Sequence, residues 1–423
     1  MSPTDAATPP RSGAPAGGGV AASDHELARL VRDEAARIVG ILTAATGNLD
    51  VAEEATAEAI EEALRAWRQH GAPARPGGWL LQAARHNALD RLRRETRYRE
   101  KLEAVRALTV EDGHPARGDE GPDERVPLLF GCCHPALAPE AQLALTLRAV
   151  LGVTTAQIAR ATLEPESTVG QRISRAKRKM AAVGIPLGIP EGAERVDRLD
   201  IVLTVVSVLY DAAHLRAGAD AVADRDLADD ALWLARVVAG ALPREAEAAG
   251  LHALLLFHRA REPARSRGGD LVLLEAQDRS LWDAALIARG RAELDRAAAL
   301  RSPGRWQLHA AIAACHVDAP TIADTDWVQM LVLYDMLRGY DGSPIVALNR
   351  AVVLSRVAGA QAALADVDAL AGPLSRYHLW HAVRARLLRD LGREAEADEA
   401  DRRAAELTSN VAEQRLLAAR RAR

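Results

Sequence analysis

Apolar residues recur at intervals of three and four along most of the chain, the spacing that places them on one face of an α-helix. The first such segment begins at Asp24, the second covers about 50–69, and the third covers about 79–101. A run rich in glycine and proline, 71–78, separates the last two segments. The pattern therefore predicts a unit of three amphipathic helices over 24–105.

A second unit, made of shorter helices, is predicted over 138–183. Its apolar positions indicate a short helix at 155–161 and a longer helix at 166–180, with a proline-containing turn between them. A short helix, a tight turn and a longer helix in this order are typical of a helix-turn-helix. Between the two units, 106–137 includes a polar run rich in glycine and proline, so we interpret it as a linker.

The second half of the chain, 195–423, consists of helical segments rich in alanine and leucine that glycine or proline interrupts. A second linker, 184–194, precedes this extension, and because the linker is short the extension is expected to stay close to the helix-turn-helix. Within 344–409 the segments repeat at an offset of roughly 34 residues, the tetratricopeptide period, which alanine-rich helical hairpins can also give by chance. Residues 1–23, rich in proline and glycine, predict a disordered tail.

The composition supports an all-α fold. Of the 423 residues, 49% are hydrophobic but only 3% are aromatic, so the cores must be built from alanine, leucine and valine. Alanine and leucine favour helices, whereas strands are enriched in aromatic and β-branched residues. The longest apolar stretch, 201–210, is far shorter than the roughly 20 residues that cross a bilayer, so we expect no membrane span.

The cysteines and the charge balance narrow the class of protein further. Cys132, Cys133 and Cys315 form no even, spaced set, which argues against a disulfide framework and favours a reducing, cytoplasmic location. The 54 basic and 58 acidic residues give a formal net charge of −4. A protein with this charge has no overall positive field to attract nucleic acid, so any nucleic-acid site must be local.

One local site of this kind is the predicted helix 166–180. It has no acidic residue after Glu166, and its arginine and lysine side chains cluster toward its end. Gln and Arg pair bidentately with adenine and guanine edges, and basic side chains also bind phosphates. The alternative is a solvated cationic helix end that the helix dipole favours. Base contacts are expected from Gln171, Arg172 and Arg175, phosphate contacts from Lys177, Arg178 and Lys179, and a further DNA contact from Ser167.

These residues carry a family resemblance. The segment 138–180 resembles region four of a bacterial extracytoplasmic-function (ECF) sigma factor, which reads the minus-thirty-five promoter element. The sequence DVAEE at 50–54, with Glu58 and Trp67, resembles region two, and the segment 79–94 resembles the helix that follows the acidic one. Both resemblances occur in the order of the family, with a linker between them.

The resemblance implies partners and site residues. The acidic helix would dock on the clamp helices of the β′ subunit of core RNA polymerase, and region four would meet the β flap. The next helix would bind the minus-ten element and its melted strand, while region four binds the double-stranded promoter DNA. The implied polymerase-binding residues are Asp50, Glu53, Glu54 and Glu58, and the implied DNA-binding residues of the next helix are Asn87, Arg91, Arg94 and Arg97.

Further segments narrow the resemblance to a subgroup with a long C-terminal helical extension. They are CCHPALAPEAQLALTLR from Cys132, LLEAQDRSLW at 273–282 and ALNRAV at 347–352. The resemblance implies a sigma factor that binds core polymerase and directs initiation at specific promoters, without catalytic residues, metal or cofactor of its own. Its tetratricopeptide-like extension would modulate activity, through contacts within the chain or with a regulatory protein.

Two motifs allow a different chemical interpretation. Cys132, Cys133 and His134 are zinc-type ligands, but adjacent cysteines do not readily share one ion, so we expect the segment to pack as the apolar start of the second unit. Trp79 either packs in the core or stacks on an unpaired base.

Polar residues among apolar ones in the extension are expected to lock helix packing rather than to form an enzyme site. No phosphate loop, nucleophile motif or carboxylate pair with a plausible base accompanies them. These residues are Asp278, Arg279 and Trp282, expected side by side on a helix, with Tyr334, Asp335, Asn349 and Arg350.

Two other functions are open at this stage. The chain could be a helix-turn-helix regulator with a helical-repeat interaction domain that acts without core polymerase, and copurification with core polymerase separates this alternative from a sigma factor. It could also house an enzyme in its C-terminal half, which turnover or ligand binding by that half would reveal.

Overall fold

The structure is a computed structural model. It describes residues 24–94, 123, 125–162, 164–214 and 221–421. Helices run through all of this part, and the strands found in it form one two-stranded hairpin. The predicted all-α fold is therefore confirmed. The predicted tail and most of the first predicted linker lie outside the described residues.

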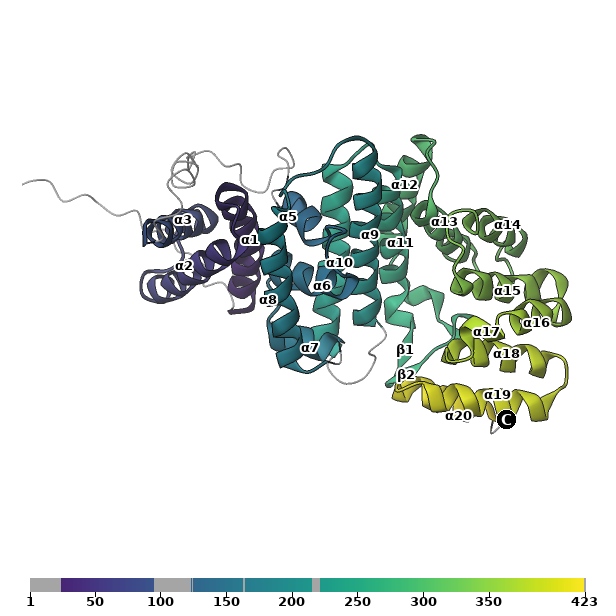
Figure 1. The fold of residues 1–423 in the computed structure, drawn as a ribbon. Coiled ribbons are helices and arrows are strands. Elements are labelled where there is room, and N and C mark those ends of the chain that lie inside the picture. Colours follow the sequence, from purple (N-terminus) through teal and green to yellow (C-terminus); the bar gives the residue numbers. More distant parts are fainter. Residues whose placement is uncertain (1–23, 95–122, 124, 163, 215–220, 422–423) are drawn as a thin grey trace, which may run out of the picture.

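The first helical unit contains α1 (Asp24–Thr46), α2 (Leu49–His70) and α3 (Pro76–Arg94) (Figure 1). Asn48 starts α2, because its side-chain oxygen accepts hydrogen bonds from the backbone N–H groups of the next turn. The buried face of α2 consists largely of alanine, whose small side chain lets neighbouring helices approach closely. These alanines are Ala52, Ala55, Ala59 and Ala63. Trp67 and Trp79 meet edge to face with ring centres 5.7 Å apart, which supports a packing role for the half-buried Trp79.

The second helical unit follows. It contains α5 (Arg125–Cys132), α6 (Pro139–Leu145), the π-helical segment η1 (Thr146–Val150), α7 (Thr155–Thr162) and α8 (Glu166–Val183). The last two helices form the helix-turn-helix with bounds close to those that the apolar spacing predicts.

The first linker predicted from the sequence, 106–137, is wrong at its C-terminal end. Helix α5 lies inside this range, and residues 128–133 are buried without a break. A helix that is covered on all sides shows no polar face, so its apolar run carries no helical period that a sequence pattern can detect. The second helical unit therefore begins at α5 rather than at residue 138.

The extension begins with α9 (Gly192–His214), α10 (Ala221–Ala241), α11 (Ala246–Arg261), α12 (Ala284–Ala299) and α13 (Arg305–Asp318). One continuous hydrophobic core extends from α1 through the second helical unit to α13. The predicted linker 184–194 takes part in this packing, since Ile185 is buried and α9 already starts at residue 192.

An arm, residues 262–283, connects α11 with α12. It contains the 3₁₀ turns η2 (Glu262–Ala264), η3 (Leu274–Ala276) and η4 (Arg279–Leu281), and an antiparallel hairpin of β1 (Ser266–Arg267) and β2 (Asp270–Leu271). The helix expected for Asp278, Arg279 and Trp282 is wrong. The Asp278 carboxylate accepts a hydrogen bond from the backbone N–H of Ser280, a local turn that competes with a continuous helix.

The last part of the extension is a curved array of helices. It contains α14 (Trp327–Leu337), α15 (Pro344–Ala358), α16 (Ala360–Ala369), α17 (Ala371–Leu374), α18 (His378–Asp390), α19 (Glu394–Leu407) and α20 (Val411–Arg421). Helices α15 and α18 begin at residues 344 and 378, and α16 and α19 at 360 and 394, so both offsets are 34 residues. In Figure 1 the array turns back on itself, so that α20 lies beside the hairpin. In the described segments, none of the helices has the length and apolar character that a bilayer crossing requires.

Candidate nucleic-acid interface and its acidic counterpart

Helix α8 is amphipathic in the way that the sequence predicts. Val169, Ile173, Ala176 and Met180 are buried at intervals of three and four, so α8 packs against α6 and α7. The helix ends at Gly184, whose left-handed backbone (φ 66°) favours glycine. The predicted DNA-binding residues that this packing leaves exposed are Ser167, Gln171, Arg175, Arg178 and Lys179.

Arg172, one of the expected base contacts, is engaged within the helix-turn-helix. Both of its terminal nitrogens bind the Glu164 carboxylate in the turn, and one of these contacts measures 2.6 Å. The hydrogen bond from Arg172 lowers the pKa of Glu164, so the pair is charged. Ion pairs at the protein surface contribute about 0–1 kcal/mol, so exchanging this pair for a contact with DNA would cost little.

A groove of about 320 Å³ runs beside the exposed side of α8. Its apolar lining includes Leu137 and Ala138, just before α6, and Ala141 in the first turns of α6. The residues that line it on α8 are mostly polar and are Thr168, Gln171, Arg172, Arg175, Ala176 and Lys179. The groove thus places four of the seven DNA-binding residues predicted on α8 along one surface.

The residues predicted on α3 and α2 form a second cluster. Arg91 of α3 binds the carboxylates of both Glu54 and Glu58 of α2, the latter at 2.6 Å. Asn87 donates hydrogen bonds to the Glu62 side chain at 3.3 Å and to the Ala55 carbonyl at 3.5 Å. The structure therefore joins residues for which the resemblance implies different partners, DNA for α3 and polymerase for α2.

Two further residues predicted on α3 cannot be placed in this cluster. Arg94 is the last residue of α3, and its side chain, like the whole of Arg97, lies outside the described part of the chain.

Lys177 forms a contact that the sequence analysis missed. Its ammonium group lies 2.8 Å from the Asp50 carboxylate and 2.6 Å from the Glu53 carboxylate, so it joins α8 to the start of α2. The Lys177 and Glu53 side chains are only 13% and 14% exposed, whereas Asp50 is 60% exposed. Burial lowers the pKa of Lys177, but the attraction of Glu53 and Asp50 outweighs burial and raises it overall. We call this contact the latch.

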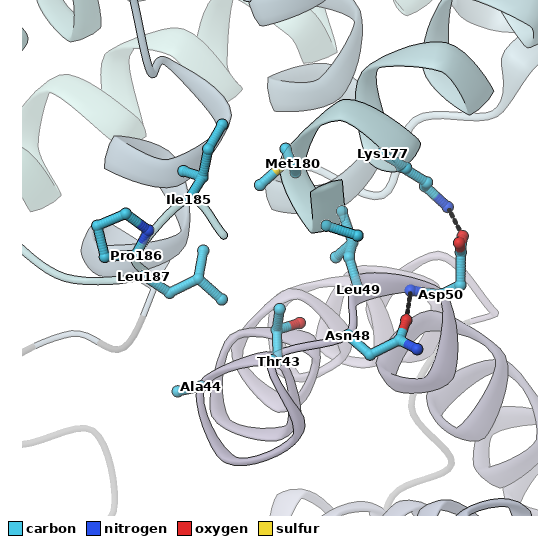
Figure 2. A pocket seen from close by; sticks show the side chains of 12 residues that line it. Thr43, Ala44, Asn48, Leu49, Asp50, Lys177, Met180, Ile185, Pro186 and Leu187 are labelled. Carbon is cyan, nitrogen blue, oxygen red and sulfur yellow. Dashed lines mark hydrogen bonds and ion pairs between the residues drawn. The ribbon is translucent and has the colours of Figure 1, made fainter. Parts of the chain in front are cut away.

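A cavity of about 220 Å³ lies beside the latch (Figure 2). Thr43 and Leu49 of the first helical unit face Met180, Ile185 and Leu187 of the second across it. Apolar packing is thus incomplete where the two units meet at α8. The residues that close the latch are more than 120 positions apart in the chain. No periodicity signals such a pair, and the only sequence clue is the opposite charge of the two helices.

The other motifs singled out in the sequence are structural. Cys132 and Cys133 are fully buried, and burial raises the pKa of Cys133 to about 12, so the segment packs as expected. Arg350 binds Asp335 at 2.6 Å and Asp366 at 3.1 Å, which ties α15 to both α14 and α16. Across the described residues, no group of three or more His, Cys, Asp or Glu side chains is arranged to hold a metal ion.

Comparisons with known proteins match three segments of the chain to protein families. Residues 30–98 match sigma-70 region 2 and residues 128–180 match sigma-70 region 4. Residues 198–298 match a family of unknown function, DUF6596. The start of the region 4 match agrees with a second helical unit that includes α5.

A relative shares nearly the full length of the chain. It is described as "Uncharacterized protein R00370" of Rhizobium meliloti (strain 1021) and is 40% identical over 372 residues, which are 86% of this chain and 88% of the relative. No solved structure matches the chain significantly. Both sigma regions occur in order, on the helices that carry the basic and acidic residues described above. The chain belongs to the ECF-like sigma factors, proteins of transcription initiation that bind DNA and RNA polymerase, and it carries an extra C-terminal domain.

Proposed function

We propose that this sigma factor binds core RNA polymerase through the acidic side of α2 and reads promoter DNA through α8 and α3. The observation that carries this proposal is the polarity of α8. One side of the helix is buried in the helix-turn-helix, and the other presents Gln171 and Arg175 beside a groove, in a chain whose net charge is −4. Those side chains would contact bases, and Lys179 would contact phosphate.

The acidic side of α2 supports polymerase binding over the alternative of a regulator that acts without polymerase. Glu54 and Glu58 remain 58% and 48% exposed even though both bind Arg91. A helix-turn-helix that only reads DNA gains nothing from a row of exposed carboxylates beside its basic helix, because carboxylates repel the DNA backbone. The proposed partners of Asp50, Glu53, Glu54 and Glu58 are the β′ clamp helices, and the proposed partner of the second helical unit is the β flap.

In this proposal, the contact that the latch makes between the first and second helical units is a closed state of the protein. Lys177 pairs with both Asp50 and Glu53, so in this arrangement its ammonium group binds these carboxylates in place of DNA phosphate, and the carboxylates bind Lys177 in place of polymerase. Residues 95–124 join α3 to α5 along the chain. Binding of polymerase would replace the latch with new contacts on α2 and free Lys177 for DNA.

The extension is proposed to act as a required positive element rather than a passive addition. It shares a hydrophobic core with the second helical unit, and the buried Arg198 of α9 donates a hydrogen bond to the Phe130 carbonyl of α5 at 2.7 Å. Arg125 of α5 also lies over the Trp233 ring of α10, with its guanidinium carbon 4.0 Å from the ring centre. Both contacts support a role for the extension in holding the DNA-reading unit in shape.

Run-off transcription with purified core polymerase on a promoter library tests the proposal. Promoter-specific transcripts are expected. Arg175→Ala should cost about 1–3 kcal/mol and relax the preference at one base, whereas Lys179→Ala should weaken all sequences alike and reduce the salt dependence. DNA binding without any polymerase-dependent transcript, and without copurification of core polymerase, would instead establish the regulator that acts alone.

A further inference from the structure

The arm, which connects α11 with α12, is fastened to the ends of α11 and α13. The backbone N–H of Asp283 donates a hydrogen bond to the Ala260 carbonyl of α11 at 2.9 Å. At the end of α13, the Nη1 atom of Arg279 donates hydrogen bonds to the backbone carbonyls of His316 and Ala319, at 2.7 and 2.6 Å. The arm therefore brings its own side chains beside the last turns of both helices.

Two arginine side chains of this region lie over the same aromatic ring. The guanidinium carbon of Arg279 lies 4.4 Å from the ring centre of Trp282, and that of Arg261, in the last turn of α11, lies 5.3 Å from it. Trp282 itself is only 8% exposed. His316 joins this group because its carbonyl binds Arg279. We call Arg261, Arg279, Trp282 and His316 the cationic cluster.

The positive charge of the cationic cluster has no carboxylate to balance it. In the part of the chain that the structure describes, neither Arg261 nor Arg279 forms an ion pair, and Asp324 attracts Arg279 only from a longer distance. Burial and the repulsion of Arg265 and Arg279 lower the pKa of Arg261 to about 10, which leaves it charged at neutral pH. Burial and both arginines of the cluster lower the pKa of His316 to about 4, so its ring is neutral. A buried cation without a partner is destabilising.

Polar atoms of the cationic cluster are also buried without a hydrogen-bond partner among the described residues. They are Arg261 Nε, Arg279 Nη2, Trp282 Nε1 and His316 Nδ1. The arginine and tryptophan nitrogens can only donate, and a neutral imidazole can donate through one of its nitrogens. Buried polar groups of folded proteins are nearly always paired. A group of buried donors beside two unpaired cations therefore points to an acceptor that carries negative charge.

We propose that the cationic cluster binds the phosphate group of a small molecule, which would hold the arm against α11 and α13. A phosphate group presents acceptor oxygens in several directions, so it can meet donors that come from the arm and from two helices. A carboxylate presents only two oxygens in one plane and would leave donors unpaired. This proposal is independent of polymerase and promoter binding.

Carboxylates near the cationic cluster restrict the kind of anion that fits. Asp211 and Glu262 act electrostatically on the neighbouring Arg265, and Asp278 and Asp283 are exposed on the arm. These carboxylates would repel a polyanion such as DNA. A single phosphate group meets less repulsion, and it can approach because the two arginines of the cluster are only half-buried.

Isothermal titration calorimetry on the full-length chain tests the proposal. The probes are inorganic phosphate and glycerol 3-phosphate, at an ionic strength held constant with chloride. Both should bind, and the tighter of the two shows whether free phosphate or a phosphate ester is preferred. Acetate should bind at least about tenfold more weakly, because it cannot pair all the donors. Absence of binding by both phosphate probes, or acetate binding as tight as phosphate, would overturn the proposal.

Arg261→Met removes one charge of the cationic cluster and keeps an unbranched side chain. It should weaken phosphate binding at least about tenfold, because a charge-assisted contact is lost. Without phosphate its melting temperature should be higher than that of the unaltered chain, since an unpaired cation is gone, whereas loss of a merely structural arginine would lower it. If this variant unfolds, Arg261→Lys replaces it, which keeps the charge but lacks the Nε donor and should also weaken binding.

Arg267→Met is the matched control, because Arg267 is an exposed arginine of the same arm. It should leave the affinity for phosphate unchanged. Phosphate should also raise the melting temperature of the unaltered chain and of this control, but not that of Arg261→Met. Equal phosphate affinities of the Arg261 variant and the unaltered chain would overturn the proposal.

Discussion

The second helical unit has two joints of different construction, one to the first helical unit and one to the extension. At the first joint, α1 packs on α5 and η1, and the charged latch at Lys177 lies beside a cavity of about 220 Å³. At the second joint, Arg198 is only 2% exposed and bonds to the α5 backbone, and 184–191 is all that separates α8 from α9.

The difference indicates which joint opens. Opening the first joint costs the packing of α1 on α5 and η1, but the charged groups of the latch regain water and new partners when they separate, which offsets part of this cost. Separation at the second joint would likewise expose apolar side chains, and it would in addition leave a buried carbonyl and guanidinium without partners, which adds about 1–3 kcal/mol. We therefore expect the second helical unit and the extension to move together as one body, away from the first unit.

Removal of the extension should have the largest effect. A chain that ends after Pro190 leaves α5 and α6 without the cover of α9, and each large apolar side chain that becomes exposed loses about 1.5–3 kcal/mol. Lower melting temperature, aggregation and reduced run-off transcription are expected. If the truncated protein has the melting temperature and the run-off yield of the full chain at the same concentration, the second joint does not stabilise the second helical unit.

A single substitution at the second joint should have the next largest effect. Arg198→Met leaves the Phe130 carbonyl without its donor, at a cost of about 1–3 kcal/mol in the free energy of unfolding measured with urea. Arg195→Met is the matched control one turn away. This substitution removes the ion pair between Glu245 and Arg195, whose side chain is 38% exposed. It should therefore lower the free energy of unfolding by less than about 1 kcal/mol. Equal losses of unfolding free energy in the two variants would show that Arg198 contributes no more to the second joint than an exposed ion pair does.

Charge reversal on α2 should weaken core polymerase binding. Glu54→Lys with Glu58→Lys replaces two exposed carboxylates of the proposed interface, and a loss of roughly tenfold in affinity is expected in competition with another sigma factor. Glu61→Lys, on the same helix and paired only with Arg65 among the described ion pairs, is the control and should have a smaller effect. Unchanged affinity of the double variant would show that α2 is not the polymerase-binding helix.

A mild change at the latch should have the smallest effect. Asp50→Asn removes the charge of the more exposed of the two carboxylates on Lys177. Binding of the free protein to promoter DNA, measured without polymerase, should become about two- to fivefold tighter, because an exposed ion pair of this kind contributes less than about 1 kcal/mol. Weaker DNA binding would mean that the closed arrangement does not restrain α8.

Local features of this molecule were predictable from the sequence. The apolar period gave the offset of 34 residues that separates α16 from α19, because each of these helices buries one face and exposes the other. The helix-turn-helix followed from the same period together with the turn at Pro165. The exposed position of Gln171 and Arg175 follows directly from the burial of Val169 and Ile173.

The remaining features depend on contacts between distant parts of the chain. Helix α5 escaped prediction because it is buried on all sides and has no polar face. The latch and the ion pair between Arg356 and Glu275 join residues far apart in the chain, for which charge alone cannot choose a partner. Residues 278–282 of the arm were expected on a helix because a count of apolar positions does not register side-chain bonds to nearby backbone, such as the one between Asp278 and the N–H of Ser280.

The most direct test of the account is to measure both joints at once by fluorescence energy transfer. Cysteines introduced at the exposed positions Gln82 of α3 and Ala182 of α8 report on the first joint, and those at Ala182 and Arg236 of α10 report on the second. The native cysteines are buried, so they should not be labelled. Addition of core polymerase should lower transfer between 82 and 182 and leave transfer between 182 and 236 unchanged. Unchanged transfer between 82 and 182 in the polymerase complex would contradict the account.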